Sequence, residues 1–211
     1  MSDEIKKNSE QNGWEAIRDA FDRLYADTLE NTQQFGTLIS WQLAGPDPLD
    51  SFRIYDGGTY WHIVGFGLSE LFEKESNNPE VSGYGMEFTF KLLKAGCADV
   101  DREIKTVIGI FQDLARLTFE EGEAFWPYEY IYTGQQQGID YEQKSRLTGL
   151  FTVPEPLLTQ LDTPYGQVQF VELVGATDAE LQAIMQGEMR VRELYEKLGS
   201  DITDLWRDSL V

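Results

Sequence analysis

Two aromatic stretches with strand-like alternation limit what this chain can fold into. Residues 60–71 read YWHIVGFGLSEL, and residues 82–92 read SGYGMEFTFKL. Large apolar side chains recur in both at a period of two, which is the pattern of a β-strand. Glycines among the rings predict places where a side chain packs over bare backbone. A sheet that contains these two strands is therefore the minimum that the fold must include.

Helices are predicted on either side of these strands. Apolar residues recur at helical spacing over 14–29 and 100–119. A third helix is predicted from Thr177 to about Leu198, because Thr177 and Glu180 form a capping box and Gly199 suits a helix end. Further strands are predicted at 35–43, 128–132, 147–153 and 167–174. This pattern predicts an α+β fold, with a central mixed or antiparallel sheet flanked by about three helices. Six rings are expected to be mostly buried: Trp61, Phe66, Phe88, Phe90, Phe111 and Phe170.

Length and charge limit the possible partners. The chain has 211 residues, enough for one domain with a substantial core. We expect the polar residues 1–12 to form a disordered tail and residues 13–211 to form a single domain. The net charge of −20 argues against nucleic acid or an anionic membrane as ligand, because both attract Lys and Arg. It is compatible with a cationic protein partner, and equally with solubility alone.

The sequence also indicates a compartment. Cys97 is the only cysteine, so no disulfide forms within the chain, which suits a reducing cytoplasm. No apolar signal segment follows Met1, and no uncharged apolar run reaches the roughly 18 residues of a membrane span. We therefore expect a cytoplasmic location.

No residue pattern of a catalytic or metal site is present. His62 and Cys97 have no metal-ligand spacing, and no phosphate-binding loop, nucleophile elbow or zinc-protease motif occurs. Runs of carboxylates, such as those around residues 70–75 and 120–123, are typical of solvated edges. We therefore expect no catalytic residue, no metal and no cofactor. His62 is expected to be a packed ring or, alternatively, part of a partner surface.

Six motifs, in order along the chain, resemble the Suppressor of fused (SUFU) domain. Besides the two aromatic stretches they are GWEAI, GPDPLD, TPYGQVQFVELVG and ITDLWR, at residues 13–17, 45–50, 163–175 and 202–207. The chain is similar to the bacterial single-domain members of that family. The resemblance implies a SUFU-like fold and a protein that binds a partner and does not turn over a substrate.

The resemblance also implies a place for the partner. It implies that a partner segment is held by strand addition beside the region 60–92. The eukaryotic member has a tyrosine and an aspartate near this site, where this chain has Phe72 and the pair Pro79-Glu80. We expect the partner surface to include Phe72, Glu80 and Tyr84. The remaining candidates are Glu70, Glu73 and Glu75 on its rim, and His62.

Two functions are consistent with these features. The first is an immunity protein, or antitoxin, that neutralises a cognate polymorphic toxin. If the toxin is a nuclease, its cationic surface would attract a protein of charge −20. The alternative is a general cytoplasmic interaction or regulatory module that binds a partner segment by strand addition.

Overall fold

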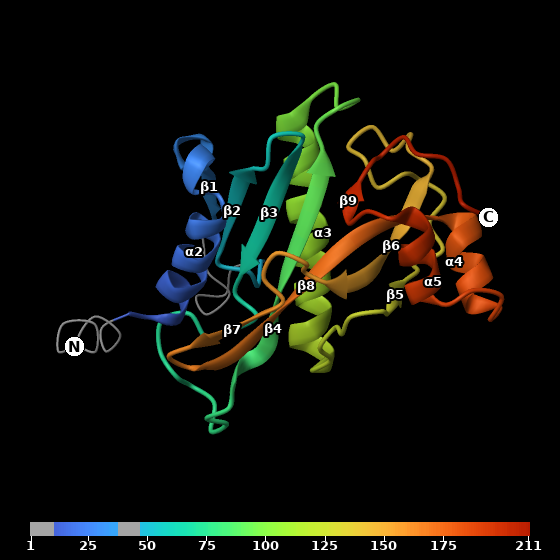
Figure 1. Ribbon diagram of the computed structural model, residues 1–211. Helices are drawn as coiled ribbons and strands as arrows, with labels where there is room; N and C mark the ends of the chain where they lie inside the picture. The colour runs from blue at the N-terminus through green and yellow to red at the C-terminus, as the bar shows by residue number, and fades with distance from the viewer. Residues whose placement is uncertain (1–10, 38–46) are drawn as a thin grey trace.

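The computed structural model describes residues 11–37 and 47–211 (Figure 1). Most of the expected tail at 1–12, and the second half of the expected strand at 35–43, lie outside these residues. The described strands are β1 Gln33–Gly36, β2 Ser51–Asp56, β3 Tyr60–Phe66, β4 Val81–Leu93, β5 Tyr130–Ile131, β6 Leu147–Pro154, β7 Gln160–Thr163, β8 Gly166–Thr177 and β9 Ile202–Thr203. The helices are α2 Gly13–Leu24, the 3-10 helix η1 Ala26–Asn31, α3 Val100–Glu121, α4 Asp178–Met185 and α5 Val191–Leu198.

The described strands form one mixed sheet. Its order is β1-β2-β3-β4-β8-β6-β5, with β7 paired to β8 and β9 paired to β4. β4 runs parallel to β8 and to β9, whereas the other pairs are antiparallel. The predicted α+β fold with a mixed sheet is therefore confirmed. None of the described helices is long and apolar enough to cross a membrane.

One face of the sheet is covered by α3. The helix begins at the side-chain cap of Asp99 and ends at Gly122, whose φ of +74° is the left-handed conformation that glycine adopts readily. Its buried side chains pack against those of the central strands, and Phe111 lies 5.7 Å from Phe88 between ring centroids. This face holds the largest apolar cluster among the described residues.

The opposite face is covered at its two ends. α2 packs on one end, where Phe21 lies against Phe170 with ring centroids 5.0 Å apart. α4 and α5 pack on the other end, against Phe151 and Val174. Phe170 and Val174 lie an even number of residues apart on β8, so both point to the same face. In Figure 1, α2 stands at one side of the sheet and α4 and α5 at the other.

All six rings of the core prediction are mostly buried, five of them completely. Phe66, Phe88, Phe90, Phe111 and Phe170 are fully buried. The Trp61 ring is partly exposed. The ammonium of Lys94 lies 3.9 Å from its centroid, so a cation covers part of the indole face.

Two helix predictions differ from the structure, one in where the helix ends and the other in its continuity. The helix expected over 14–29 ends at Leu24, and η1 follows it. The helix expected over 177–198 has the predicted capping box and the predicted stop at Gly199, but it is two helices. Gly187, with φ +75°, follows the last turn of α4 and ends it. The strands β2, β7 and β9 were not predicted. β7 and β9 are short, and β2 carries polar residues among its apolar ones.

Candidate partner-binding site

The two aromatic motifs meet in a hollow where β3 ends and β4 begins. The hollow has a volume of about 410 Å³. We call it the groove; it is lined by residues 67–73, Glu75, Gly83, Tyr84, Pro48, Asp50 and Phe119. Five of the seven candidate residues touch or line it: Glu70, Phe72, Glu73, Glu75 and Tyr84.

One buried carboxylate holds several residues that line the groove in place. Glu87, from β4, accepts hydrogen bonds from the backbone N–H groups of Gly67, Leu68 and Ser69, at 2.9, 3.3 and 2.9 Å. The Ser69 hydroxyl donates a fourth, at 2.6 Å. Burial raises the pKa of Glu87 to about 7, although these donors oppose the shift. Glu87, in the second aromatic stretch, therefore holds in place the turn at residues 67–69, in the first aromatic stretch.

Gly67 is required where it stands in this turn. Its φ is +145°, and a Cβ there would lie 2.8 Å from the Cα of Leu49. A side chain would therefore meet both backbone strain and a backbone collision.

A second carboxylate, Glu70, ties down the next part of the turn. Its carboxylate accepts hydrogen bonds from Lys74 Nζ at 2.6 Å, from the Glu75 N–H at 2.8 Å and from the Gly83 N–H at 3.1 Å. Lys74 Nζ also donates to the carbonyl of Tyr165 at 2.7 Å, on the β7–β8 hairpin. Only 8% of the Glu70 side chain is exposed. Glu70 was expected on the rim, but it acts as an internal tie beneath it.

Phe72 is an exposed ring on a fixed backbone. The residue is 59% exposed. The Trp14 N–H donates to the Leu71 carbonyl at 2.9 Å, and the Tyr165 hydroxyl donates to the Phe72 carbonyl at 2.6 Å. A large apolar side chain whose backbone is already ordered loses little further entropy when a partner covers it. Phe72 therefore has the properties of a binding anchor.

The aromatic wall opposite Phe72 is half-buried. Tyr84 lies at the start of β4, and its ring centroid is 5.2 Å from that of Phe119 on α3. The Tyr84 N–H donates to the Leu68 carbonyl at 2.9 Å. The ring thus packs against the helix on one side while it lines the groove on the other.

The charge of the groove has one sign. Asp50, Glu70, Glu73 and Glu75 line it, and no Lys or Arg is among its lining residues. Glu73 and Glu75 are exposed, whereas burial raises the pKa of Asp50 above its usual range. Carboxylates next to aromatic rings favour a cationic side chain, through ion pairing and cation–π contact.

The other two candidates lie outside the groove. Glu80 is exposed on the loop before β4, where its N–H donates to the Asn78 side chain at 3.0 Å. His62 is fully buried, as expected for a packed ring, so its ring does not line a partner surface, which was the alternative expectation. The Cys97 thiol donates to the Leu93 carbonyl, and burial raises its pKa to about 11, so it is not a reactive thiolate.

The strand addition expected beside the region 60–92 finds no open edge along β3 in this sheet. β3 pairs with β2 along one edge and with β4 along the other. Where β4 extends beyond β3, the segment that follows β3 covers it, through the bond from Tyr84 N–H to Leu68. Among the described strands, the sheet order ends at β1 and β5, and β7 and β9 each pair with one strand only. The groove therefore offers side-chain contacts, and backbone pairing with a partner is left to strands that have an unpaired edge.

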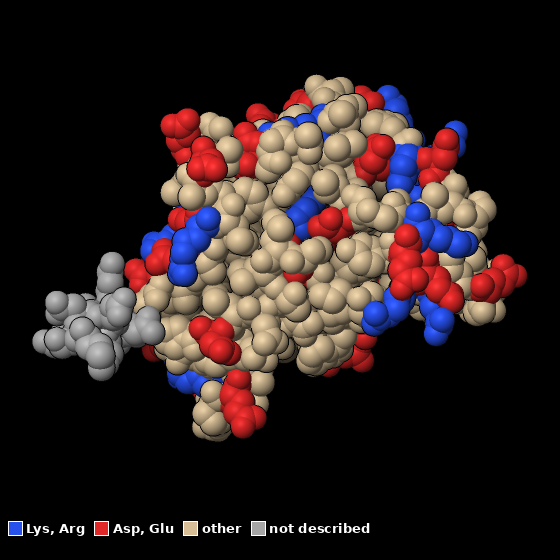
Figure 2. Space-filling view, viewed as in Figure 1, with Lys and Arg blue, Asp and Glu red and all other residues tan. Residues whose placement is uncertain are grey.

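Eight residues that line the groove were not among the candidates. Five of them, Gly67, Leu68, Ser69, Leu71 and Gly83, belong to the two aromatic stretches, and the other three are Pro48, Asp50 and Phe119. Pro48 and Asp50 belong to the GPDPLD motif, which was a usable signal. Phe119 lies at the end of the α3 stripe and had no signal of its own. Charge elsewhere is dispersed: on the face shown in Figure 2, acidic and basic side chains lie mainly toward the periphery, with uncharged areas between them.

Comparisons with known proteins agree with this architecture. The sequence model of the Suppressor of fused protein (SUFU) family matches residues 45–208. The Suppressor of fused homologs of Homo sapiens and Mus musculus are each 27% identical over 187 residues, covering 82% of this chain and 37% of theirs. The chain thus spans little more than a third of the length of these relatives.

Two solved structures share the fold. One, described as the Sufu-Fu complex, has a TM-score of 0.78 and 27% identity, and the match covers 94% of this chain and 92% of that one. The other, Drosophila Suppressor of Fused, also has a TM-score of 0.78, with 26% identity over 96% of this chain and 52% of that one.

Proposed function

The chain belongs to the Suppressor of fused family, and from that premise we propose that it is a non-catalytic protein-binding domain. One solved relative is a complex with another protein, Fu, which supports a binding role. The observation that carries the proposal is the groove itself. It presents an exposed ring, Phe72, on a backbone held by hydrogen bonds, and surrounds it with carboxylates.

The shape and charge of the groove point to a class of partner. A hollow of about 410 Å³ is the size of a few side chains and not of a whole domain. Its lining favours a basic residue, Lys or Arg, next to an apolar one that covers Phe72. Glu73 and Glu75, both exposed, form the acidic rim. The partner is thus a protein with a basic, partly apolar segment.

We propose further that the partner is a toxin and that this chain is its immunity protein in the cytoplasm. The support is the net charge of −20 together with the single sign of the groove. A nuclease toxin needs a cationic surface for phosphates, and an acidic protein would reach and cover that surface rapidly. The alternative is a regulatory module whose partner segment pairs with an outer strand, β1 or β5; the polar composition of β1 and the shortness of β5 make this the weaker proposal.

Affinity capture with matched variants tests the proposal. The tagged protein, its Phe72→Ala variant and a Met185→Ala control are used to capture partners from a lysate, and the captured proteins are identified. Met185 is 47% exposed on α4, away from the groove. We expect a basic protein that the wild type and the control retain and that Phe72→Ala releases. Equal retention by all three would remove the groove from the proposal, and a captured protein without toxic activity would favour the regulatory alternative.

A further inference from the structure

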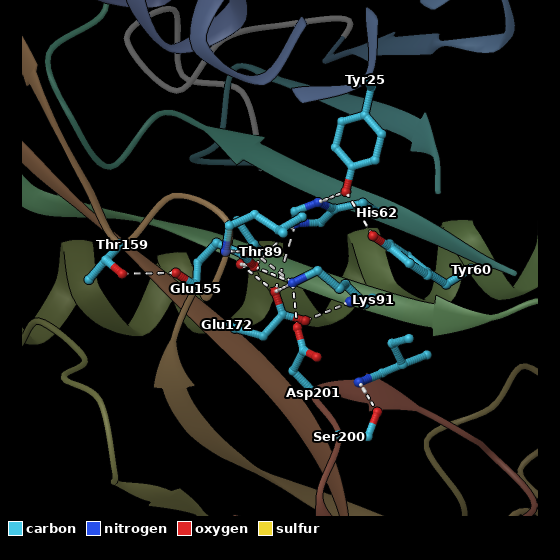
Figure 3. A network of polar contacts seen from close by, with 12 residues as sticks. Tyr25, Tyr60, His62, Thr89, Lys91, Glu155, Thr159, Glu172, Ser200 and Asp201 are labelled. Atoms are coloured by element: carbon cyan, nitrogen blue, oxygen red, sulfur yellow. Dashed lines mark hydrogen bonds and ion pairs between the residues drawn. The ribbon is translucent and has the colours of Figure 1, made fainter. Parts of the chain in front are cut away.

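A buried polar cluster lies on the sheet face between α2 and the pair α4 and α5 (Figure 3). We call it the central cluster: His62 of β3, Thr89 and Lys91 of β4, Glu172 of β8, and Glu155 and Asp201 from connecting segments. The strand register places His62 opposite Lys91 and Thr89 opposite Glu172. All of these side chains except that of Asp201 are at most 2% exposed.

The His62 ring directs one nitrogen at two carboxylates. Its Nε2 lies 3.4 Å from Glu155 Oε2 and 3.8 Å from Glu172 Oε2, and it has no hydrogen-bond partner among the described residues. Its Nδ1 lies 2.7 Å from the Tyr25 hydroxyl, which is 3.3 Å from the Tyr60 hydroxyl. If Nδ1–H donates to Tyr25 and Tyr25 donates to Tyr60, the Nε2 lone pair faces the carboxylates. Burial lowers the pKa of His62, so the ring is neutral and able to act as a ligand.

The central cluster holds three carboxylates but only one ammonium group, that of Lys91, to pair with them. Lys91 Nζ pairs with Glu155 and with Asp201, at 2.6 Å each, but lies 3.6 Å from Glu172 Oε2. Buried carboxylates require a nearby cation, donors or a proton. Thr89 Oγ1 donates to Glu172 Oε2 at 2.6 Å, and the Lys91 N–H donates to Glu172 Oε1 at 2.7 Å. Burial raises the pKa of Glu172 well above its usual range, although Lys91 opposes the shift.

Although the sequence pattern predicts no metal site, we propose that His62, Glu155 and Glu172 form a binding site for a divalent transition-metal cation of the Zn²⁺ class. The three ligand atoms lie within 4.8 Å of one another, close enough to surround one ion after small movements. One imidazole with two carboxylates is a donor set that Zn²⁺ and neighbouring metals accept. The Tyr25 contact at Nδ1 and the Thr89 contact at Glu172 are the outer hydrogen bonds that orient such ligands.

Lys91 lowers the affinity of this site for a metal ion. Its ammonium shares Glu155 with the proposed ion, and like charges repel at this range. A bound ion therefore competes with Lys91 for Glu155 and leaves the ammonium paired with Asp201. The bound ion joins β3, β8 and the segment after β6, so it stabilises the sheet between its two helix-covered ends.

Binding of Zn²⁺ alone tests the inference. Protein freed of metal by a chelator is dialysed against Zn²⁺, and bound zinc and the melting temperature are measured. We expect one zinc per chain and a raised melting temperature. Glu172→Gln and His62→Gln should each weaken binding by at least about tenfold, since each removes a ligand. Lys91→Met should strengthen it, because the competing ammonium is gone.

A surface variant is the control. Glu120→Gln with Glu121→Gln removes two exposed carboxylates and should leave zinc binding unchanged. Circular dichroism establishes that each variant is folded, and Lys91→Met provides a gain that misfolding cannot produce. Absence of stoichiometric zinc in both the wild type and Lys91→Met would overturn the inference. Zinc binding that survives both ligand substitutions would overturn it as well.

Discussion

Two carboxylates at the groove, Glu87 and Glu70, both hold its backbone by hydrogen bonds, but their pKa values are shifted in opposite directions. Each accepts hydrogen bonds from several backbone N–H groups of residues 67–83. Glu87 is fully buried without a cationic partner, and burial raises its pKa to about 7. Burial also opposes ionisation of Glu70, but Lys74 and the backbone donors outweigh it and hold the pKa at about 2. The groove is thus held by one carboxyl group that favours the protonated form, Glu87, and one that favours the ionised form, Glu70.

Opposite pH dependences of stability follow from these two shifts. The native state keeps the Glu87 proton between about pH 4.5 and 7 while the unfolded state loses it, so the contribution of Glu87 falls as pH rises through this range. The contribution of Glu70 is present above about pH 4.5 and is lost as pH falls toward 2. The measurement is the melting temperature of the wild type, Glu87→Gln and Glu70→Gln between pH 3 and 8.

We expect the advantage of the wild type over Glu87→Gln to shrink as pH rises from about 4.5 to 7. Its advantage over Glu70→Gln should shrink as pH falls below about 4.5. For Glu70→Gln, loss of charge-assisted hydrogen bonds typically costs about 1.5–3 kcal/mol, which corresponds to several degrees for a chain of this length. Parallel pH profiles for the two variants would contradict the assigned shifts.

At the scale of elements, the sheet is stabilised by different helices on its two faces. α3 covers one face along β3, β4 and β8, while α2 and the pair α4 and α5 divide the other. The space left between them holds the central cluster and not apolar side chains. Alternation along β8 produces this arrangement, because residues 171 and 173 face α3 while Phe170, Glu172 and Val174 face the divided side.

Truncation of one ring on each face tests this packing. Phe88 lies under α3 and Phe170 under α2, and both are fully buried. Phe88→Ala and Phe170→Ala should each lower the free energy of unfolding by about 3–5 kcal/mol, because each removes a buried ring and leaves a cavity. The measurement is chemical denaturation, and Phe72→Ala is the matched control, since its ring is exposed and its loss should cost little. A small effect for either buried ring would contradict the packing described for its face.

At the scale of the whole molecule, the excess of 37 acidic over 17 basic residues acts over longer distances than any single contact. Several carboxylates are already paired inside the fold: Glu180 with Arg207, Glu155 with Lys91 and Glu70 with Lys74. Glu73 and Glu75 are exposed at the groove, where they face an approaching partner. The global charge and the groove charge therefore have separable effects.

Two double variants with the same net charge separate the effect of the groove charge from that of the global charge. Glu73→Lys with Glu75→Lys, and Glu188→Lys with Glu196→Lys, change the net charge equally, but only the first pair is at the groove. With the captured partner, stopped-flow kinetics at several salt concentrations should show slower association and a weaker salt dependence for the groove pair. The distant pair on and near α5 should change both much less. Equal effects would mean that net charge, and not the groove, governs association.

Local signals in the sequence determined most of the elements. The period-two runs at β3, β4, β6 and β8 and the helical stripe of α3 depend only on residues close together along the chain. The capping box at Thr177 and the glycine stop at Gly199 are local as well. Motif order alone also indicated the family and placed Phe72, Tyr84 and the neighbouring glutamates at one site. Where competing local signals overlapped, as at Gly187 inside an apparent helix, the prediction was wrong.

Only the tertiary structure decided what these elements bring together. The parallel pairing of β4 with β8 joins strands far apart in the sequence, and with it come Thr89 opposite Glu172 and the whole central cluster. Nothing near His62 in the sequence indicates that Glu155 and Glu172 lie beside it. The same holds for Glu70, which reads as one of several surface carboxylates until the fold supplies Lys74 and the N–H of Gly83. The environment of a charged group is set by its neighbours in space, so the burial, partners and protonation of these side chains follow from the strand order and not from local pattern.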